Sequence, residues 1–270
     1  MESKGLKRLK LKTGIVIFLT AYFSSACLAL TDSKAGQSLD GFSLVQYEDN
    51  VKRKWQLEGK EANIEEELAR IDEVSAIVFG KKAAFKLKAK KGYFDLKEQK
   101  GTLQEDVVIK STDGTRVRAD YLDWYGKTDI ISSDGLVSIH RRDFDIIGKG
   151  VFYDLNQKIA RFKEDVAVNS IMPDVDVVVT CDGPFEIDYD KGWATFYNNV
   201  AIKDKRGNVF SNRVDLYLGE DKKELEKIVA RENVEISDRD NIITTDEAIY
   251  IVKEEKLILP NKPRLVMKNE

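Results

Sequence analysis

The side chains that could do chemistry are few in this 270-residue sequence, and their spacing does not suit catalysis. His140 is the only histidine, and it stands in an alternating apolar and polar stretch beside Arg141 and Arg142. A general base needs a reacting partner within hydrogen-bond reach, and no Ser or Cys motif accompanies this histidine. A lone histidine in a strand is more often a surface residue than a base. The sequence therefore predicts a protein that is not an enzyme.

The sequence also lacks the spacing of a metal site. Cys27 lies in an apolar segment, which leaves Cys181 alone in the rest of the chain. No pair of cysteines or histidines stands at ligand spacing. Two acidic pairs are explained more simply as turn or edge carboxylates than as calcium ligands: Asp174/Asp176 and Asp188/Asp190. We therefore expect neither a metal nor another cofactor.

The dominant pattern is a motif that recurs about every thirty residues, which is typical of stacked supersecondary units. Each copy has a short acidic or Asn-containing segment, predicted to be a turn, and then two apolar residues two positions apart. The anchoring valines are 30, 29, 34 and 34 residues apart, and Val74, a further 33 residues before Val107, indicates an earlier degenerate copy. The apolar pairs are Val107/Ile109, Val137/Ile139, Val166/Val168, Val200/Ile202 and Val234/Ile236.

A period of two places each apolar pair on one face of a β-strand. A small residue stands 18 positions before each of the first three valines: Ala89, Ala119 and Gly148. Between the two lies an aromatic-rich run and then a turn of Gly, Asn or Lys residues, which is typical of strands joined by turns. Pro260 and Pro263 interrupt the last unit and indicate the end of the array. The sequence predicts an all-β chain of repeated two-strand units.

The N-terminus predicts export. Residues 1–12 form a basic tail, and 13–31 run for 19 residues without a charge, just long enough to span a bilayer as a helix. A cleaved signal peptide has the same features, and the sequence before Cys27 also faintly resembles a lipoprotein box. We rank a retained single-pass membrane anchor first, a cleaved signal second and a lipid-modified Cys27 third. Residues 32–41 then form a linker, and 42–270 form the exported domain.

Charge excludes one class of partner. Beyond residue 12 the chain has 39 Lys and Arg against 46 Asp and Glu, a formal charge of about −7. Nucleic-acid binding needs a net basic surface, so we expect no nucleic acid. We expect first that the lysines between Lys81 and Lys91 lie on solvated strand faces or on sheet edges, where their charge discourages pairing with another sheet. The alternative is that they face an anionic headgroup.

The order of these features resembles that of a known family. The single N-terminal span, the short linker, Phe42-Ser43-Leu44 and the stretch from Trp55 to Ala62 together resemble the start of LptC, the bitopic inner-membrane component of the bacterial lipopolysaccharide export machine. The following units look like the OstA-like repeats shared by LptC and its periplasmic relative LptA. The exported domain here is longer than is typical of LptC, as if it carried extra LptA-like units.

The resemblance implies a fold and a function. The fold would be a twisted, open β-jelly roll with an apolar inner face, behind a transmembrane helix. The domain would lie in the periplasm, take lipopolysaccharide from the inner-membrane ABC transporter components of the machine, and hold its lipid A acyl chains in a groove. Edge-strand pairing would join it to an LptA-like protein or an outer-membrane receptor. The expected groove residues are Leu57, Leu87, Val107, Ile109, Val137, Ile139, Phe152, Val166, Val168, Val200 and Ile202.

A second interpretation of the same residues is an anchored adaptor that binds periplasmic proteins and never contacts lipid. It predicts a closed interior filled by side chains, whereas the carrier predicts an open apolar groove.

Overall fold

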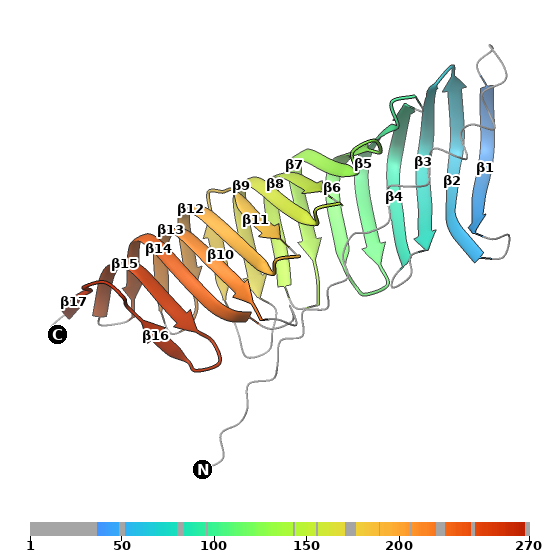
Figure 1. Ribbon diagram of the computed structural model, residues 1–270. Helices are drawn as coiled ribbons and strands as arrows, with labels where there is room; N and C mark the ends of the chain where they lie inside the picture. The colour runs from blue at the N-terminus through green and yellow to red at the C-terminus, as the bar shows by residue number, and fades with distance from the viewer. Residues whose placement is uncertain are drawn as a thin grey trace. The chain divides into compact units, whose positions relative to one another are not determined.

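A computed structural model describes residues 37–48, 52–79, 84–95, 97–142, 144–154, 156–170, 177–188, 190–205, 207–219, 225–238 and 241–267. These residues form seventeen β-strands and no helix, and the strands pair antiparallel (Figure 1). The prediction of an all-β fold is confirmed, and the arrangement is consistent with a β-jelly roll. The chain divides into two compact units near residue 156. We call them the N-terminal unit and the C-terminal unit.

The N-terminal unit is a meander in which each strand pairs with the next along the chain. Its strand β1 begins at Gln37, within the residues predicted as linker. The strands are β1 (Gln37–Glu48), β2 (Lys52–Glu65), β3 (Leu68–Phe79), β4 (Ala84–Asp95), β5 (Lys100–Ser111), β6 (Arg116–Tyr125), β7 (Ile130–His140) and β8 (Phe144–Asp154).

The C-terminal unit repeats this pattern, except that two short strands together cover one long neighbour on each side. Both β10 and β11 pair with β9 and with β12. At the end of the array, β16 and β17 pair with opposite ends of β15, and Pro260 and Pro263 lie between them. The strands are β9 (Ile159–Ser170), β10 (Val178–Cys181), β11 (Phe185–Asp188), β12 (Trp193–Lys203), β13 (Asn208–Leu218), β14 (Leu225–Ser237), β15 (Asn241–Ile251), β16 (Lys256–Ile258) and β17 (Arg264–Met267).

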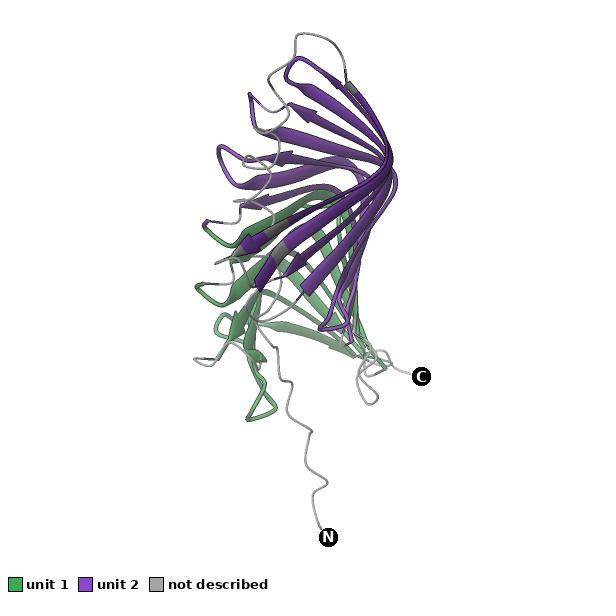
Figure 2. Cartoon of the chain, turned by 90° about the vertical axis from the view of Figure 1, so that its right-hand side faces the viewer, with its two compact units in different colours: residues 1–13, 157–270 green, residues 14–156 purple. Residues whose placement is uncertain are grey.

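The acidic and Asn-containing pairs are β-bulges inside long strands, so the prediction that they are turns is wrong. Glu105 and Asp106 lie in the middle of β5, both with positive φ, and the register of β5 against β4 and β6 shifts there. Asn198 and Asn199 in β12 have the same conformation. Such bulges bend a strand, and Figure 2 shows the strands of the N-terminal unit (purple) bent midway along their length. Each strand therefore has two arms, one on either side of the bend.

The anchoring valines form the core at these bends. Val74, Val107, Val137, Val166, Val200 and Val234 are each no more than 2% exposed. Each lies opposite a small residue of a neighbouring strand. Val74 lies opposite Ala89, Val107 opposite Ala119, and Val137 between Ala119 and Gly148. Val166 lies opposite Cys181, Val200 opposite Ser211, and Val234 opposite Thr245. Because a branched side chain alternates with a small one, the two arms can approach each other closely. Ala119 and Val137, which stand 18 residues apart in the sequence, are directly paired across β6 and β7 at the bend.

The predicted basic tail (1–12) and membrane-spanning segment (13–31) lie outside the described residues. Among the residues that are described, no helix is long and apolar enough to cross a membrane.

Candidate functional site

An unbroken row of apolar side chains crosses one arm of the N-terminal unit. Residues that pair directly across strands lie on the same face of a sheet. The row contains one residue from each strand, in the order Leu44, Leu57, Ala76, Leu87, Ile109, Val117, Ile139 and Ile146. The positions before and after each of these side chains project from the opposite face. This arm therefore presents one continuous apolar strip.

The other arm of the same strands carries a second apolar row with aromatic residues. It runs through Ile64, Ala69, Phe94, Gly101, Trp124, Ile131 and Tyr153. Side chains of both arms line one groove with about 710 Å³ of empty space, a volume that includes the part open to solvent.

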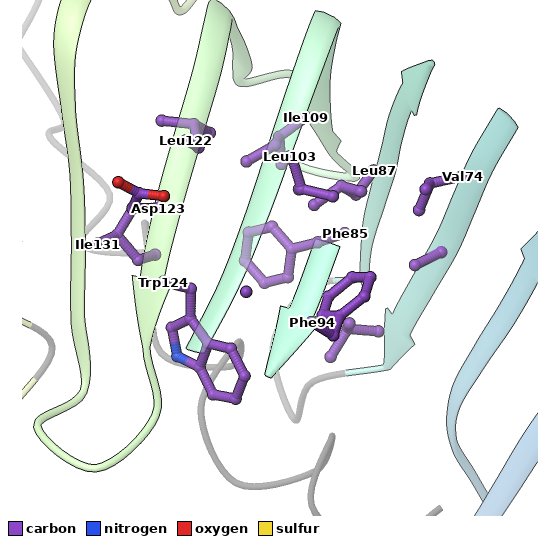
Figure 3. Close-up of a pocket in the computed structure, with 13 residues that line it drawn as sticks. Val74, Phe85, Leu87, Phe94, Leu103, Ile109, Leu122, Asp123, Trp124 and Ile131 are labelled. Carbon is purple, nitrogen blue, oxygen red and sulfur yellow. The ribbon is translucent and has the colours of Figure 1, made fainter. Parts of the chain in front are cut away.

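The groove lining is almost wholly hydrocarbon. Figure 3 shows the rings of Phe85, Phe94 and Trp124 directed toward the same space. Among the residues that line it, Asp123 is the only charged one, and its carboxylate accepts a hydrogen bond of 2.5 Å from the Thr102 hydroxyl. A surface of this composition can hold an alkyl chain by burial. It offers no pair of groups that could move a proton.

Two glycines make room for the aromatic rings. A Cβ atom at Gly92 would lie 2.8 Å from both the Phe94 ring and the Val74 side chain. At Gly101 it would lie 3.1 Å from Phe94 and 3.4 Å from Trp124. The Phe94 and Trp124 rings thus contact the backbone of β5, where a side chain would otherwise stand.

The structure brings together most of the groove residues predicted in this unit. Leu57, Leu87, Ile109 and Ile139 belong to the strip, and Leu87 and Ile109 line the open space directly. Val107 and Val137 lie on the same face but are 1% and 2% exposed. They are buried at the bend and are not among the residues that line the open space.

Phe152 is the exception. Val137 pairs with Gly148, Ser133 pairs with Val151, and Ile131 pairs with Tyr153. These pairings place Val151 and Tyr153 on the groove face, so Phe152 projects from the opposite face of β8. The alternation of β8 changes phase at Gly150, which has a φ of 69° and stands opposite the bulge of β7.

The four groove residues predicted in the C-terminal unit also share one face. Val168 and Ile202 belong to a row that continues through Val179, Val209, Ile236, Ile243 and Leu265. Val166 and Val200 lie beside them at the bend, 2% and 1% exposed. On the second arm, the rings of Phe185 and Phe196 stack with centroids 4.3 Å apart.

A buried carboxylate on the C-terminal unit is fully paired. Asp215 is 2% exposed and accepts hydrogen bonds from the Thr195 hydroxyl at 2.8 Å and from Nε of Arg213 at 2.9 Å. Arg231 bonds its other oxygen and also contacts Glu247. The hydrogen bond with Asp215 raises the pKa of the Arg213 guanidinium. These groups therefore hold neighbouring strands together as an ion-pair network.

His140 and Cys181, the side chains considered above for catalysis or metal binding, each contact a residue of a neighbouring strand. His140 is exposed and pairs with Asp145 on the neighbouring strand. Cys181 is buried opposite Val166, and burial raises the pKa of its thiol to about 11. Within the described ranges, no group of three or more His, Cys, Asp or Glu side chains is placed to hold a metal.

The aromatic arm of the groove is the part that sequence reasoning missed. Phe94, Leu103, Leu122, Trp124 and Ile131 line the space but were not among the expected residues. The signal was present in two aromatic runs, Gly92 to Leu96 and Tyr121 to Tyr125, whose alternate residues face inward. Their phase could be assigned only from the cross-strand register.

Comparison with known proteins gives one match. A family described as "Lipopolysaccharide-assembly, LptC-related" matches residues 14–170, which is more than half of the chain and includes all of the groove. No curated protein matches the chain.

Proposed function

Because this chain belongs to the LptC family, whose role is in lipopolysaccharide transport, we propose that it is a non-enzymatic carrier of lipopolysaccharide. The groove of the N-terminal unit would hold the acyl chains of lipid A while the sugars stay in water. The observation that carries this proposal is the apolar groove between the two arms, with its unbroken row of apolar residues across eight strands.

Burial energies support an acyl ligand. Each buried methylene contributes about 0.8 kcal/mol, so a segment of eight methylenes contributes about 6 kcal/mol before the cost of ordering the chain. The strip is long in the direction that crosses the strands, and hydrophobic attraction has no directional preference. An acyl chain could therefore move from one strand to the next without a large barrier, as transport requires.

Edge-strand pairing is the proposed route of transfer. Among the described strands, β1 pairs with β2 alone, so its other edge is available to a further strand. We expect this edge to meet the ABC transporter components that supply the lipid. An LptA-like protein or an outer-membrane receptor would pair with the array at its other end, with the domain in the periplasm and anchored to the inner membrane.

Site-specific photo-crosslinking in cells tests the carrier directly. A benzophenone amino acid at Ile109 faces the groove, and one at the next residue, Lys110, faces the other side of β5 as a matched control. We expect lipopolysaccharide adducts at position 109 and several-fold fewer at 110. A folded protein that gives protein adducts but no lipid adduct at position 109 would instead be the anchored adaptor.

A further inference from the structure

The face of the N-terminal unit opposite the groove carries a patch of cations. In the row next to the apolar strip, Lys86 pairs with Lys110, and Lys110 pairs with Arg116. In the row on the other side, Lys88 and Arg118 flank Val108. We call these five residues the basic patch. Within the described part of the chain, none of them has a carboxylate partner within 4.0 Å.

Such a row has a cost for folding. Directly opposite residues in an antiparallel pair have Cβ atoms about 4.5–5.5 Å apart, and like charges at that distance destabilise the sheet. The neighbouring lysines show the alternative, because Lys90 pairs with Asp106 at 2.7 Å and Lys91 bonds Glu105. Repulsion that is retained in the middle of the arm is relieved when an anionic partner binds.

The C-terminal unit provides an internal comparison. In strands β9, β10, β12, β13 and β14, its two rows at the equivalent positions contain one cation, Lys203, and one carboxylate, Glu235. The same backbone positions therefore accept neutral side chains. The charge of the basic patch is a property of the N-terminal unit and is not required by the fold.

Two exposed apolar residues adjoin the patch. Ile147 is 40% exposed and follows Arg118 and Ser138 in the same cross-strand row. Leu136 is 53% exposed and lies two positions before Ser138, on the same face. Cations beside exposed apolar side chains are the composition of surfaces that lie on a bilayer. Four of its five residues are exposed, and such an open face suits a membrane better than a small anion.

We propose that the basic patch, with Leu136 and Ile147, docks the N-terminal unit on a bilayer surface of anionic phospholipid headgroups. Only residues 32–36 separate the predicted span from β1, a tether of at most about 20 Å. Docking through this face leaves the groove on the other face open. The proposal holds whether or not the groove carries lipid.

The test uses the full chain reconstituted into vesicles, with a benzophenone amino acid at Leu136. We expect at least fivefold more phospholipid adduct when phosphatidylglycerol makes up a third of the phosphatidylcholine vesicle. The gain should vanish at 1 M salt, where charges are screened beyond about 3 Å. The matched control is Phe210, which is 40% exposed on the equivalent face of the C-terminal unit and should show no such gain.

Charge reversal completes the test. The triple variant Lys86→Glu/Lys110→Glu/Arg116→Glu should lose the phosphatidylglycerol-dependent adduct, and Lys203→Glu should keep it. The milder Lys110→Gln should lower the adduct two- to threefold without lowering the melting temperature, because it removes repulsion. Equal adduct yields with and without phosphatidylglycerol, or yields unchanged by Lys110→Gln and by the triple variant, would overturn the proposal. The same crosslinker used in cells would also overturn it by capturing an acidic protein at position 136 in place of lipid.

Discussion

Val107 of β5 lies directly opposite Ala119 of β6, and Ala119 in turn lies opposite Val137 of β7. One small side chain thus separates two fully buried valines at the bend of the N-terminal unit. The groove depends on this contact, because it fixes how closely the two arms approach. A larger or a smaller side chain at this contact should change both the stability of the unit and the shape of the apolar strip.

Truncation of Val107 tests the role of this core position. Val107→Ala removes two methyl groups from a side chain that is 1% exposed and should lower the free energy of unfolding by about 1–3 kcal/mol. The adjacent Val108 is half-buried on the other face, so Val108→Ala should cost no more than about 0.5 kcal/mol. Urea unfolding of the two variants measures the difference. Equal losses would contradict the assignment of Val107 to the core.

Asp106 tests whether backbone conformation holds the bend. Its φ of 56° is unfavourable for a β-branched side chain and free of cost for glycine. Asp106→Val should destabilise the unit by about 1–3 kcal/mol, whereas Asp106→Gly should be close to neutral. Both variants remove the exposed ion pair with Lys90, so a similar loss in both would assign the effect to that pair.

Leu103 tests the groove as an apolar surface. It lines the open space and is half-buried, and the next residue, Gln104, projects from the other face of β5. Leu103→Asn should reduce lipopolysaccharide adducts at position 109 about tenfold, because an amide in the groove loses water when an acyl chain covers it. Gln104→Asn should leave the adducts unchanged. Unaltered adducts in Leu103→Asn would place the lipid elsewhere.

Asp188 gives the C-terminal unit a dependence on pH. Burial alone would raise the pKa of this carboxyl, which is 3% exposed, but hydrogen bonds from the backbone N–H and the ammonium of Lys191 lower it overall. Because the pKa is lowered in the folded state, the ionised carboxylate stabilises the fold. This contribution to the free energy of unfolding is complete above the pKa of the unfolded chain, about 3.9, and is lost as the pH falls through the folded pKa.

Asp188→Asn should therefore cost about 1–2 kcal/mol at pH 6. The difference from the parent chain should shrink as the pH is lowered from about 4 toward 2. Urea unfolding across that range measures it, and the exposed Asp246→Asn serves as the control. A difference that grows on acidification would show that the sign is wrong.

The sequence determines the repeated strand pairs and most of the residues that face inward, because a period of two assigns the face of Val107, Ile109, Val137 and Ile139 alike. Two features of the structure could not be predicted from the sequence. Glu105 and Asp106 have the composition of a turn, since left-handed conformations occur in turns and in bulges, and only the pairing of both neighbours distinguishes these. Phe152 lies on the opposite face because the alternation of β8 changes phase at Gly150, which stands opposite the two bulged residues Asp134 and Gly135 of β7.

The alternation of buried valines with small partners has a consequence for how such a gene can change in length. Loss or gain of one residue within a strand would turn the apolar rows outward. Loss or gain of a whole hairpin leaves each row in phase and shortens or extends it by two side chains. The spacing of 29 to 34 residues between valines is thus the natural step for insertions and deletions. Duplication of hairpins can therefore lengthen such a chain's array of strands while the cross-section stays the same.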